Sequence, residues 1–399
     1  MTKLGDFYSD FIRIDIDARG GFARVAEVKT KGQREMPDLC AFKVMRDKQD
    51  TDEERVSVLQ HFDNEIELLI KITKDTNAPS AITPIYDSGF VLAELSQNLH
   101  NRENPDPELA IVSTGLDLHQ FRHHKRTLYD KEPGKWLPYL VVELAPYDDS
   151  LLRQINAQPQ EDSEGLFRFP TGEVIALAVQ LLDVMQYLHT KHGLAYMDWK
   201  PEHIYWDGLN YQARLIDWNV TARLEESPGK AQNIMDDIRL FCGAVLYIGL
   251  TFVNPDNPMQ PIGPRPTKEL ASPVPEIRRR YWTDNPDFYQ RNKALDENIK
   301  SIIRRGLDPN RGFESIEKLK SYLLEYAENE FGIQEAELTL VSGPLSPYFK
   351  AMTEVHQAQK QFLQAQKHLY EAVAAKGIKP EFTRLNTAIK RALGNFPIA

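Results

Sequence analysis

Residues 192–207 of this chain read HGLAYMDWKPEHIYWD, and residues 215–219 read LIDWN. Two short strand-like runs between Asp198 and Asp217 predict a small hairpin. The separation of 19 positions between these aspartates suits a loop followed by such a hairpin. A single aspartate in a loop is most often a turn cap. A functional role for the two carboxylates can therefore be inferred only together with the residues around them.

The chain upstream of these stretches has the pattern of a sheet with one helix. Phe11–Ile16 alternates with period two, a glycine pair interrupts it, and strand patterns resume at Val25–Val28 and Leu39–Met45, which is typical of hairpin-linked strands. Two further strands are expected at Ala81–Tyr86 and Tyr139–Leu144. Apolar residues then recur three and four positions apart and predict a helix: Val56, Leu59, Phe62, Ile66 and Leu69.

The chain downstream of Tyr147 is mainly helical in pattern. Val174–Leu188 is apolar at helical spacing, and a buried helix is expected to start at Asp237. The apolar run Leu240–Val253 has 14 residues, which is too short to span a bilayer. Five prolines between Pro255 and Pro266 predict an extended loop, and helices return from Asn298 to Tyr326.

Two segments stand outside this plan. Residues 91–135 are polar and contain HNRENPDPEL and HQFRHHKR, which favours a variable surface insertion. Residues 331–399 predict a separate helical extension. A heptad-like seam with two glutamines runs there from Tyr348 to Val373. We expect this seam to pack back on the main domain, and the alternative is a dimeric coiled coil.

Composition limits the class of protein. With 399 residues the chain is long enough for roughly two to three domains, and 10% aromatic residues are too many for a disordered chain. The formal charge of −10 argues against a general nucleic-acid binder. Two cysteines make no disulfide framework, and Met1–Asp10 lacks the apolar core of a signal peptide. We therefore expect a cytoplasmic protein that binds neither nucleic acid nor membrane.

Taken in order, the motifs resemble those of the eukaryotic-type protein kinase family. That family usually shows His-Arg-Asp, then Lys-Pro-Glu-Asn, then Asp-Phe-Gly, and this chain has YMD, KPEH and DWN at residues 196–198, 200–203 and 217–219. Upstream, the glycine turn, Ala41-Phe42-Lys43 and the helix with Glu65 follow the family order. Downstream, LDP at residues 307–309 with Arg311 resembles the closing motif, so the likeness covers roughly residues 11–326.

The resemblance implies an α+β, bilobal kinase-like fold. The small β-rich N-lobe with one main helix would span residues 1–144, with the insertion at about 91–135. The large, mostly helical C-lobe would span residues 145–330, and residues 331–399 would form the C-terminal helical extension. These boundaries follow from the family likeness and not from composition.

The resemblance also implies ATP and Mg²⁺ or Mn²⁺ as cofactors. Lys43 would contact the α and β phosphates and Glu65 would hold it by an ion pair. Asp198 would accept or orient the proton of the attacking hydroxyl, and Lys200 would stabilise the transferring phosphoryl group. Asp217 would bind the metal, with His203 in the second metal position. The remaining nucleotide-binding residues implied by the family are Ala18, Gly20, Gly21, Val25, Ala41, Glu143, Ala145 and Tyr205.

Several positions depart from the family pattern. His203 stands where the family has asparagine, and its ring nitrogen suits Mn²⁺ better than Mg²⁺; alternatively it only hydrogen-bonds the catalytic loop. Tyr196 and Met197 replace His-Arg, which argues against activation by a phosphate on the following segment. Only nine residues separate Asn219 from Gly229, which leaves little platform for an extended peptide.

Three functions are consistent with these residues. The favoured one is an atypical protein kinase that phosphorylates a Ser or Thr on itself or on a protein partner. The first alternative is a pseudokinase scaffold that acts through protein contacts. The second is a small-molecule kinase of the aminoglycoside-phosphotransferase type. Such enzymes share the catalytic aspartate and the metal-binding aspartate, but the Lys-Pro-Glu run argues against this alternative.

Overall fold

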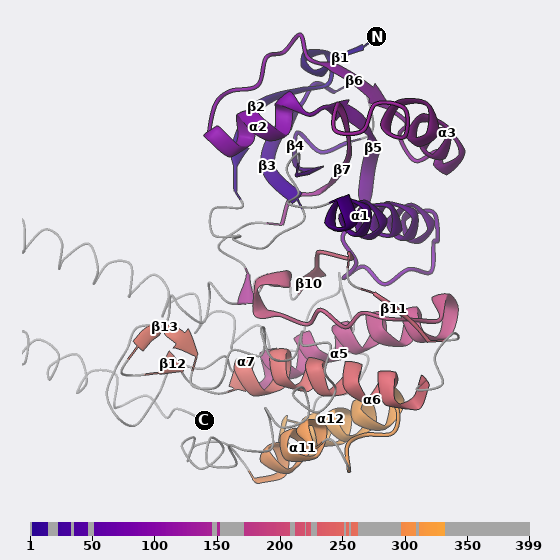
Figure 1. Ribbon diagram of the computed structural model, residues 1–399. Coiled ribbons are helices and arrows are strands. Elements are labelled where there is room, and N and C mark those ends of the chain that lie inside the picture. Colours follow the sequence, from indigo (N-terminus) through magenta and orange to yellow (C-terminus); the bar gives the residue numbers. More distant parts are fainter. Residues whose placement is uncertain are drawn as a thin grey trace, which may run out of the picture. The chain divides into compact units, whose positions relative to one another are not determined.

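The computed structural model describes residues 2–14, 23–32, 36–46, 52–145, 150–151, 171–207, 212–219, 221–224, 230–250, 253–254, 257–261, 297–308 and 311–331 (Figure 1). The chain divides into two compact units, residues 1–344 and 345–399. The predicted seam from Tyr348 to Val373 lies outside the described residues. So do Ala18, Gly20 and Gly21 of the glycine turn.

The first part of the chain builds a seven-stranded sheet in which every pairing is antiparallel. After β1, a 3-10 turn at Leu4–Asp6 leads into the second strand in sequence. In sheet order the strands are β1 (Thr2–Lys3), β6 (Ala110–Ser113), β5 (Ile85–Leu92), β7 (Trp136–Glu143), β4 (Leu39–Met45), β3 (Ala23–Thr30) and β2 (Tyr8–Arg13).

The strands predicted at Val25–Val28 and Leu39–Met45 are confirmed as β3 and β4. The strand predicted at Phe11–Ile16 begins three residues earlier, as β2, and ends at Arg13. On β4, Phe42 is fully buried and stacks on Tyr139 of the neighbouring strand at 4.7 Å between ring centroids. Lys43 follows on the other face, because successive side chains of a strand point to opposite sides. The expected strand at 81–86 begins later, at Ile85, because a turn closed by Ile82 N–H and the Pro79 carbonyl precedes it and Ile82 forms a bridge with Leu215 instead.

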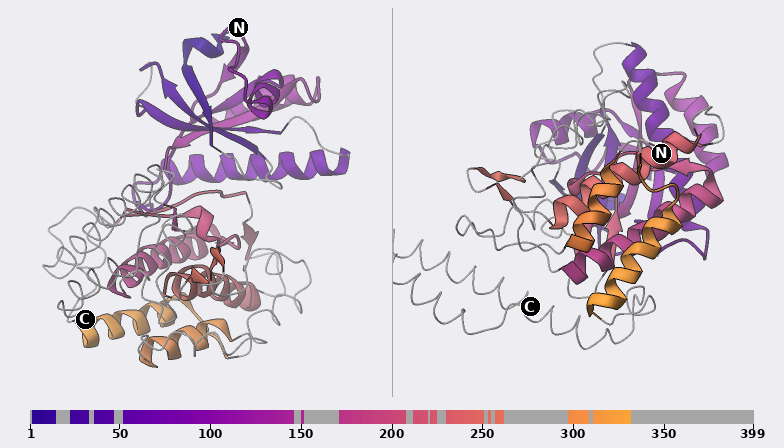
Figure 2. Two further views of the ribbon diagram at one scale, coloured as in Figure 1. Left: turned by 90° about the vertical axis from the view of Figure 1, so that its left-hand side faces the viewer. Right: turned by 90° about the horizontal axis from the view of Figure 1, so that it is seen from below.

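The predicted amphipathic helix is confirmed as α1 (Asp52–Thr73). Figures 1 and 2 show it running across one side of the sheet, where it contacts β4, β5 and β7. Its buried apolar residues include Val58, Phe62 and Ile66. Glu65 is buried beside them with only 2% of its surface exposed. A carboxylate so deeply buried requires a partner.

The segment 91–135, expected to be a polar and variable surface insertion, contains regular helices and a strand. This segment folds into α2 (Glu94–Asn101), β6, α3 (Leu118–His124) and the π-helical turn η2 (Lys125–Tyr129). It adds a strand to the sheet between β1 and β5. Isolated apolar residues among the polar ones supply its core: Leu95, Leu99, Leu109, Ile111, Phe121 and Tyr129.

The second part is mainly helical, and α5 is buried on nearly every side, as expected for a helix that is apolar all round. Figure 2 shows α11 and α12 packed near α5 and α6. The helices and turns are α5 (Thr171–Tyr187), η4 (Leu188–His192), η5 (Pro201–His203), α6 (Lys230–Phe241), η6 (Cys242–Tyr247), α7 (Ile248–Leu250), α11 (Glu297–Leu307) and α12 (Ile316–Phe331).

Three strand pairs complete this part. They are β9 (Ile204–Asp207) with β10 (Gln212–Leu215), β8 (Leu194–Ala195) with β11 (Ala222–Arg223), and β12 (Val253–Asn254) with β13 (Asn257–Pro261). The first pair is the hairpin predicted between Asp198 and Asp217. The last pair lies where an extended loop was expected.

The helix expected to start at Asp237 begins seven residues earlier, at Lys230, so Asp237 lies inside it. Among the described residues, no helix combines the length and apolar character needed to cross a membrane.

Candidate active site

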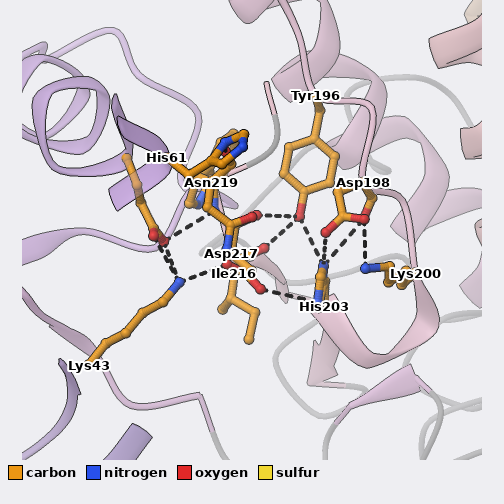
Figure 3. A network of polar contacts seen from close by, with 11 residues as sticks. Lys43, His61, Tyr196, Asp198, Lys200, His203, Ile216, Asp217 and Asn219 are labelled. Carbon is orange, nitrogen blue, oxygen red and sulfur yellow. Dashed lines mark hydrogen bonds and ion pairs between the residues drawn. The ribbon is translucent and has the colours of Figure 1, made fainter. Parts of the chain in front are cut away.

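Lys43 is the central cation of the site. Its ammonium nitrogen lies 2.8 Å and 2.9 Å from the carboxylate oxygens of Glu65 and 2.7 Å from Oδ1 of Asp217 (Figure 3). Strand β4, helix α1 and the loop after β10 each contribute one of these residues. The sheet and the segment 174 positions further along the chain are thus joined through one amine.

These charges shift one another's pKa. Burial alone would lower the pKa of Lys43, but the carboxylates of Asp217 and Glu65 raise it overall, so the amine stays charged. Burial alone would raise the pKa of Asp217, but Lys43 and His203 bring it down to about 2. Burial keeps the pKa of Glu65 raised, with Lys43 acting against it. The site therefore holds an ionised Asp217 beside a fixed positive charge.

The backbone around the two aspartates adopts unusual conformations. Asp217 has φ of 64° and Met197, next to Asp198, has φ of 63°. Left-handed conformations are costly for residues other than glycine and persist only where the surroundings enforce them. At Asp217 the next peptide N–H, of Trp218, donates to Glu65 at 3.2 Å, and the His61 ring lies 2.8 Å from the carbonyl oxygen of Asn219.

Asp198 forms the second cluster of the site. Its residue surface is 8% exposed, and its Oδ1 lies 2.7 Å from the ammonium of Lys200. The sequence-predicted pair Asp198 and Lys200 is thus brought together directly. Its other oxygen, Oδ2, lies 3.4 Å from Nδ1 of His203, and a carboxylate oxygen in such a position can accept a proton from a nearby hydroxyl.

His203 lies between the two aspartates. Its Nδ1 is 3.4 Å from Oδ2 of Asp198 and 3.2 Å from that residue's carbonyl oxygen, and its Nε2 is 3.4 Å from Oδ2 of Asp217. Ligand atoms from all three side chains fall within 4.8 Å of one another. Two carboxylates and an imidazole at this spacing are a donor set that fits a divalent cation.

Two residues that matter to this geometry were not selected from the sequence as site residues. The hydroxyl of Tyr196 donates to the carbonyl oxygen of Ile216 at 2.6 Å and lies 3.1 Å from that of Asp217 (Figure 3). The loop before Asp198 is thereby linked to the loop that carries Asp217. The buried hydroxyl needs such acceptors.

The other residue is Asp237, which is fully buried in α6. Its carboxylate accepts from the N–H groups of Tyr196 and Met197, at 3.2 Å and 2.9 Å, and from the indole N–H of Trp199 at 2.7 Å. The His189 ring lies 2.8 Å away. An aspartate at the head of an apolar run was the available signal, because a buried acid must find donors.

The predicted nucleotide-binding residues that the structure describes lie on β3, β4, β7 and β9 and just after β7. Val25 pairs with Lys43 across β3 and β4, and Ala41 is buried on β4. Glu143 ends β7, where its N–H donates to the carbonyl oxygen of Pro84 at 3.1 Å and its carboxylate accepts from Arg214 at 2.7 Å. Ala145 follows β7, and Tyr205 is half-buried on β9.

Comparisons with known proteins add little. No protein-family model matches the sequence, and no curated protein matches it. Among solved structures, the kinase PK-1 of Cydia pomonella granulovirus is similar over 79% of this chain and 94% of its own, with a TM-score of 0.44 and 13% sequence identity. A likeness this weak does not establish a shared fold.

Proposed function

We propose that this chain is an atypical protein kinase with two lobes, residues 1–144 and 145–330. It transfers the γ-phosphoryl group of ATP to a Ser or Thr on itself or on a protein partner. The observation that carries the proposal is Lys43, held between Glu65 and Asp217 at 2.7–2.9 Å while Asp198 lies beside Lys200. A phosphotransferase needs these elements, because its chemistry is mainly positioning and charge stabilisation.

Each residue then has one task. Lys43 exchanges its contact with Asp217 for phosphate oxygens when ATP binds, and Glu65 keeps the ammonium in place. Asp217 and His203 would hold a divalent cation, which would supply charge neutralisation for the phosphates when bound. Oδ2 of Asp198 takes the proton of the attacking hydroxyl, and Lys200 offsets the charge of the moving phosphoryl group.

Phosphate transfer from γ-labelled ATP tests this function. The full chain is incubated with Mg²⁺ or Mn²⁺ beside Asp198→Ala and Asp198→Asn. We expect label on serine or threonine of the wild type and a rate about 10²-fold to 10⁴-fold lower in both variants. The matched control is Asp38→Asn, an exposed aspartate just before β4, which should transfer at the wild-type rate. Equal labelling in all four proteins would refute the role of Asp198.

One observation favours a second candidate, a scaffold that acts through protein contacts. Lys43 contacts both Glu65 and Asp217, and Asp217 lies near His203, so the buried charges of the site are balanced by one another within the chain. Thermal unfolding separates the two candidates. Metal–ATP at about 100 times its Kd should stabilise a nucleotide-binding protein by about 2.7 kcal/mol, whereas no shift at millimolar ATP with either metal would favour the scaffold.

A further inference from the structure

The segment formed by α3 and η2, residues 118–129, touches the helix that carries Glu65. We call it the clamp segment. Lys125 forms an ion pair with Asp63 of α1, and Arg122 forms one with Glu67 at 2.7 Å. The Lys125–Asp63 pair is the more enclosed of the two, with side-chain exposures of 29% and 14% against 55% and 29% for Arg122–Glu67. Enclosed pairs are screened less by solvent, so Lys125 is the stronger contact.

The two ion pairs of the clamp segment lie on one face of α1, and Glu65 lies on the opposite face. Asp63 and Glu67 are four residues apart and share one face of the helix. Glu65 is two residues from each, which turns it about 200° around the axis to the opposite face. The clamp segment therefore holds the side of α1 that faces away from Lys43, while Lys43 and the Trp218 N–H hold the other side.

The clamp segment is itself attached to the sheet. Phe121 of α3 is buried and stacks on Phe90 of β5 at 5.0 Å between ring centroids. Tyr129 at the end of η2 is also buried. The loop just before the clamp segment is also tied to the end of α1, because Lys74 donates to the carbonyl oxygen of Leu116 at 2.7 Å. A segment anchored in this way can transmit the position of the sheet to α1.

We propose that Lys125, supported by Arg122, is a positioning residue that sets where α1 lies and hence whether Glu65 reaches Lys43. The same helix presents His61 to the carbonyl oxygen of Asn219, so a shift of α1 disturbs both sides of the site. The effect on catalysis rests on the proposed function. The effect on α1 itself does not.

Hydrogen exchange and kinetics on the full chain test the proposal. Lys125→Met keeps the aliphatic stem and removes the charge, and Lys125→Asp combined with Asp63→Lys swaps the pair. The matched control is Lys131→Met, an exposed lysine six positions further along the chain. We expect Lys125→Met to speed exchange of amides 58–73 while amides of β3 and β4 stay protected. We also expect its kcat to fall roughly tenfold to a hundredfold, as for a displaced catalytic geometry, with the KM for ATP changed much less.

The charge swap should restore both the protection of α1 and most of kcat. Wild-type exchange in α1 of Lys125→Met, or a swap that restores neither quantity, would overturn the proposal. Arg122→Gln, at the more exposed pair, gives a smaller effect of the same kind and serves if Lys125→Met does not fold. If the wild type transfers no phosphate, the proposed function fails, while the exchange measurement still decides the role of the clamp segment.

Discussion

Two buried glutamates of this molecule have opposite surroundings. Glu65 on α1 is 2% exposed and faces the ammonium of Lys43. Glu173 on α5 is 1% exposed and accepts from the indole N–H of Trp206 at 2.9 Å, and its Oε1 has no hydrogen-bond partner among the described residues. Burial raises the pKa of both, and that of Glu173 reaches about 7. Burial is therefore common to the two glutamates, and what distinguishes them is that only Glu65 faces a cation.

The largest expected effect comes from making Glu65 resemble Glu173. Lys43→Met leaves Glu65 buried without a cation, and breaking a buried ion pair in this way costs about 3–5 kcal/mol. We expect Lys43→Met to lower the free energy of unfolding by roughly that amount at neutral pH and to abolish phosphate transfer. Urea unfolding and the labelled-ATP assay measure the two effects.

A double variant and a control variant test whether the loss of stability comes from the unpaired charge of Glu65. Lys43→Met combined with Glu65→Gln should regain most of the stability but none of the activity, because the buried charge is gone and so is the phosphate contact. Lys29→Met, on the exposed side of β3, should match the wild type in both assays. A single Lys43→Met variant as stable as the wild type would show that Glu65 tolerates burial without its partner.

A middle-sized effect concerns pH and Glu173. Its pKa in the folded chain is about 7, above the ordinary value of 4.5. Between these values the unfolded chain ionises this carboxyl and the folded chain does not. The free energy of unfolding therefore falls as pH rises from about 4.5 to about 7, by roughly 3 kcal/mol through this group, and then levels off. Glu173→Gln keeps the acceptor for Trp206 and removes this loss.

Chemical unfolding of Glu173→Gln and the wild type at pH 5 and pH 8 measures the difference. We expect a small difference at pH 5 and a more stable variant at pH 8. Glu328→Gln, exposed on α12, is the control and should follow the wild type at both values. If the free energy of unfolding changed with pH in the same way in Glu173→Gln and the wild type, Glu173 would ionise in the folded protein at its ordinary pKa. The two buried glutamates would then differ less than their surroundings indicate.

The smallest expected effect concerns the metal preference at Asp217. Like Glu65, Asp217 is a carboxylate that faces the ammonium of Lys43. His203 brings a nitrogen to the same place, and Mn²⁺ accepts nitrogen more readily than Mg²⁺ does. We expect faster initial transfer rates with Mn²⁺ than with Mg²⁺, and a narrower gap in His203→Asn. Equal metal ratios in the two proteins would leave His203 as a residue that only hydrogen-bonds the Asp198 loop.

The parts that could be predicted from sequence are those with a local signal. Period-two alternation around a glycine pair predicted β2, β3 and β4, and the stripe through Phe62 and Ile66 predicted α1. The motifs selected Lys43, Glu65, Asp198 and Asp217, which the structure brings close together. Their catalytic roles stay predictions.

The remainder depends on distant contacts. The clamp segment has only isolated apolar residues, such as Phe121 and Tyr129, among polar ones. Its sequence therefore lacks the apolar spacing from which a helix could be predicted. Lys125 and Asp63 are 62 positions apart, and their pairing requires the fold to be known. The same holds for Asp237, whose donors lie 38 to 48 positions away.

The carboxylate of Asp237 also has a consequence for the order in which the protein assembles during synthesis. Lys43 and Glu65 lie within the first 65 residues, and a ribosome releases the N-terminal sheet first. The loop with Tyr196, Met197 and Trp199 obtains its buried acceptor only when α6 has emerged and folded. A nascent chain that ends before α6 therefore contains Lys43 and Glu65 but leaves the N–H groups of this loop without their buried acceptor, so the loop next to Asp198 is completed late in synthesis.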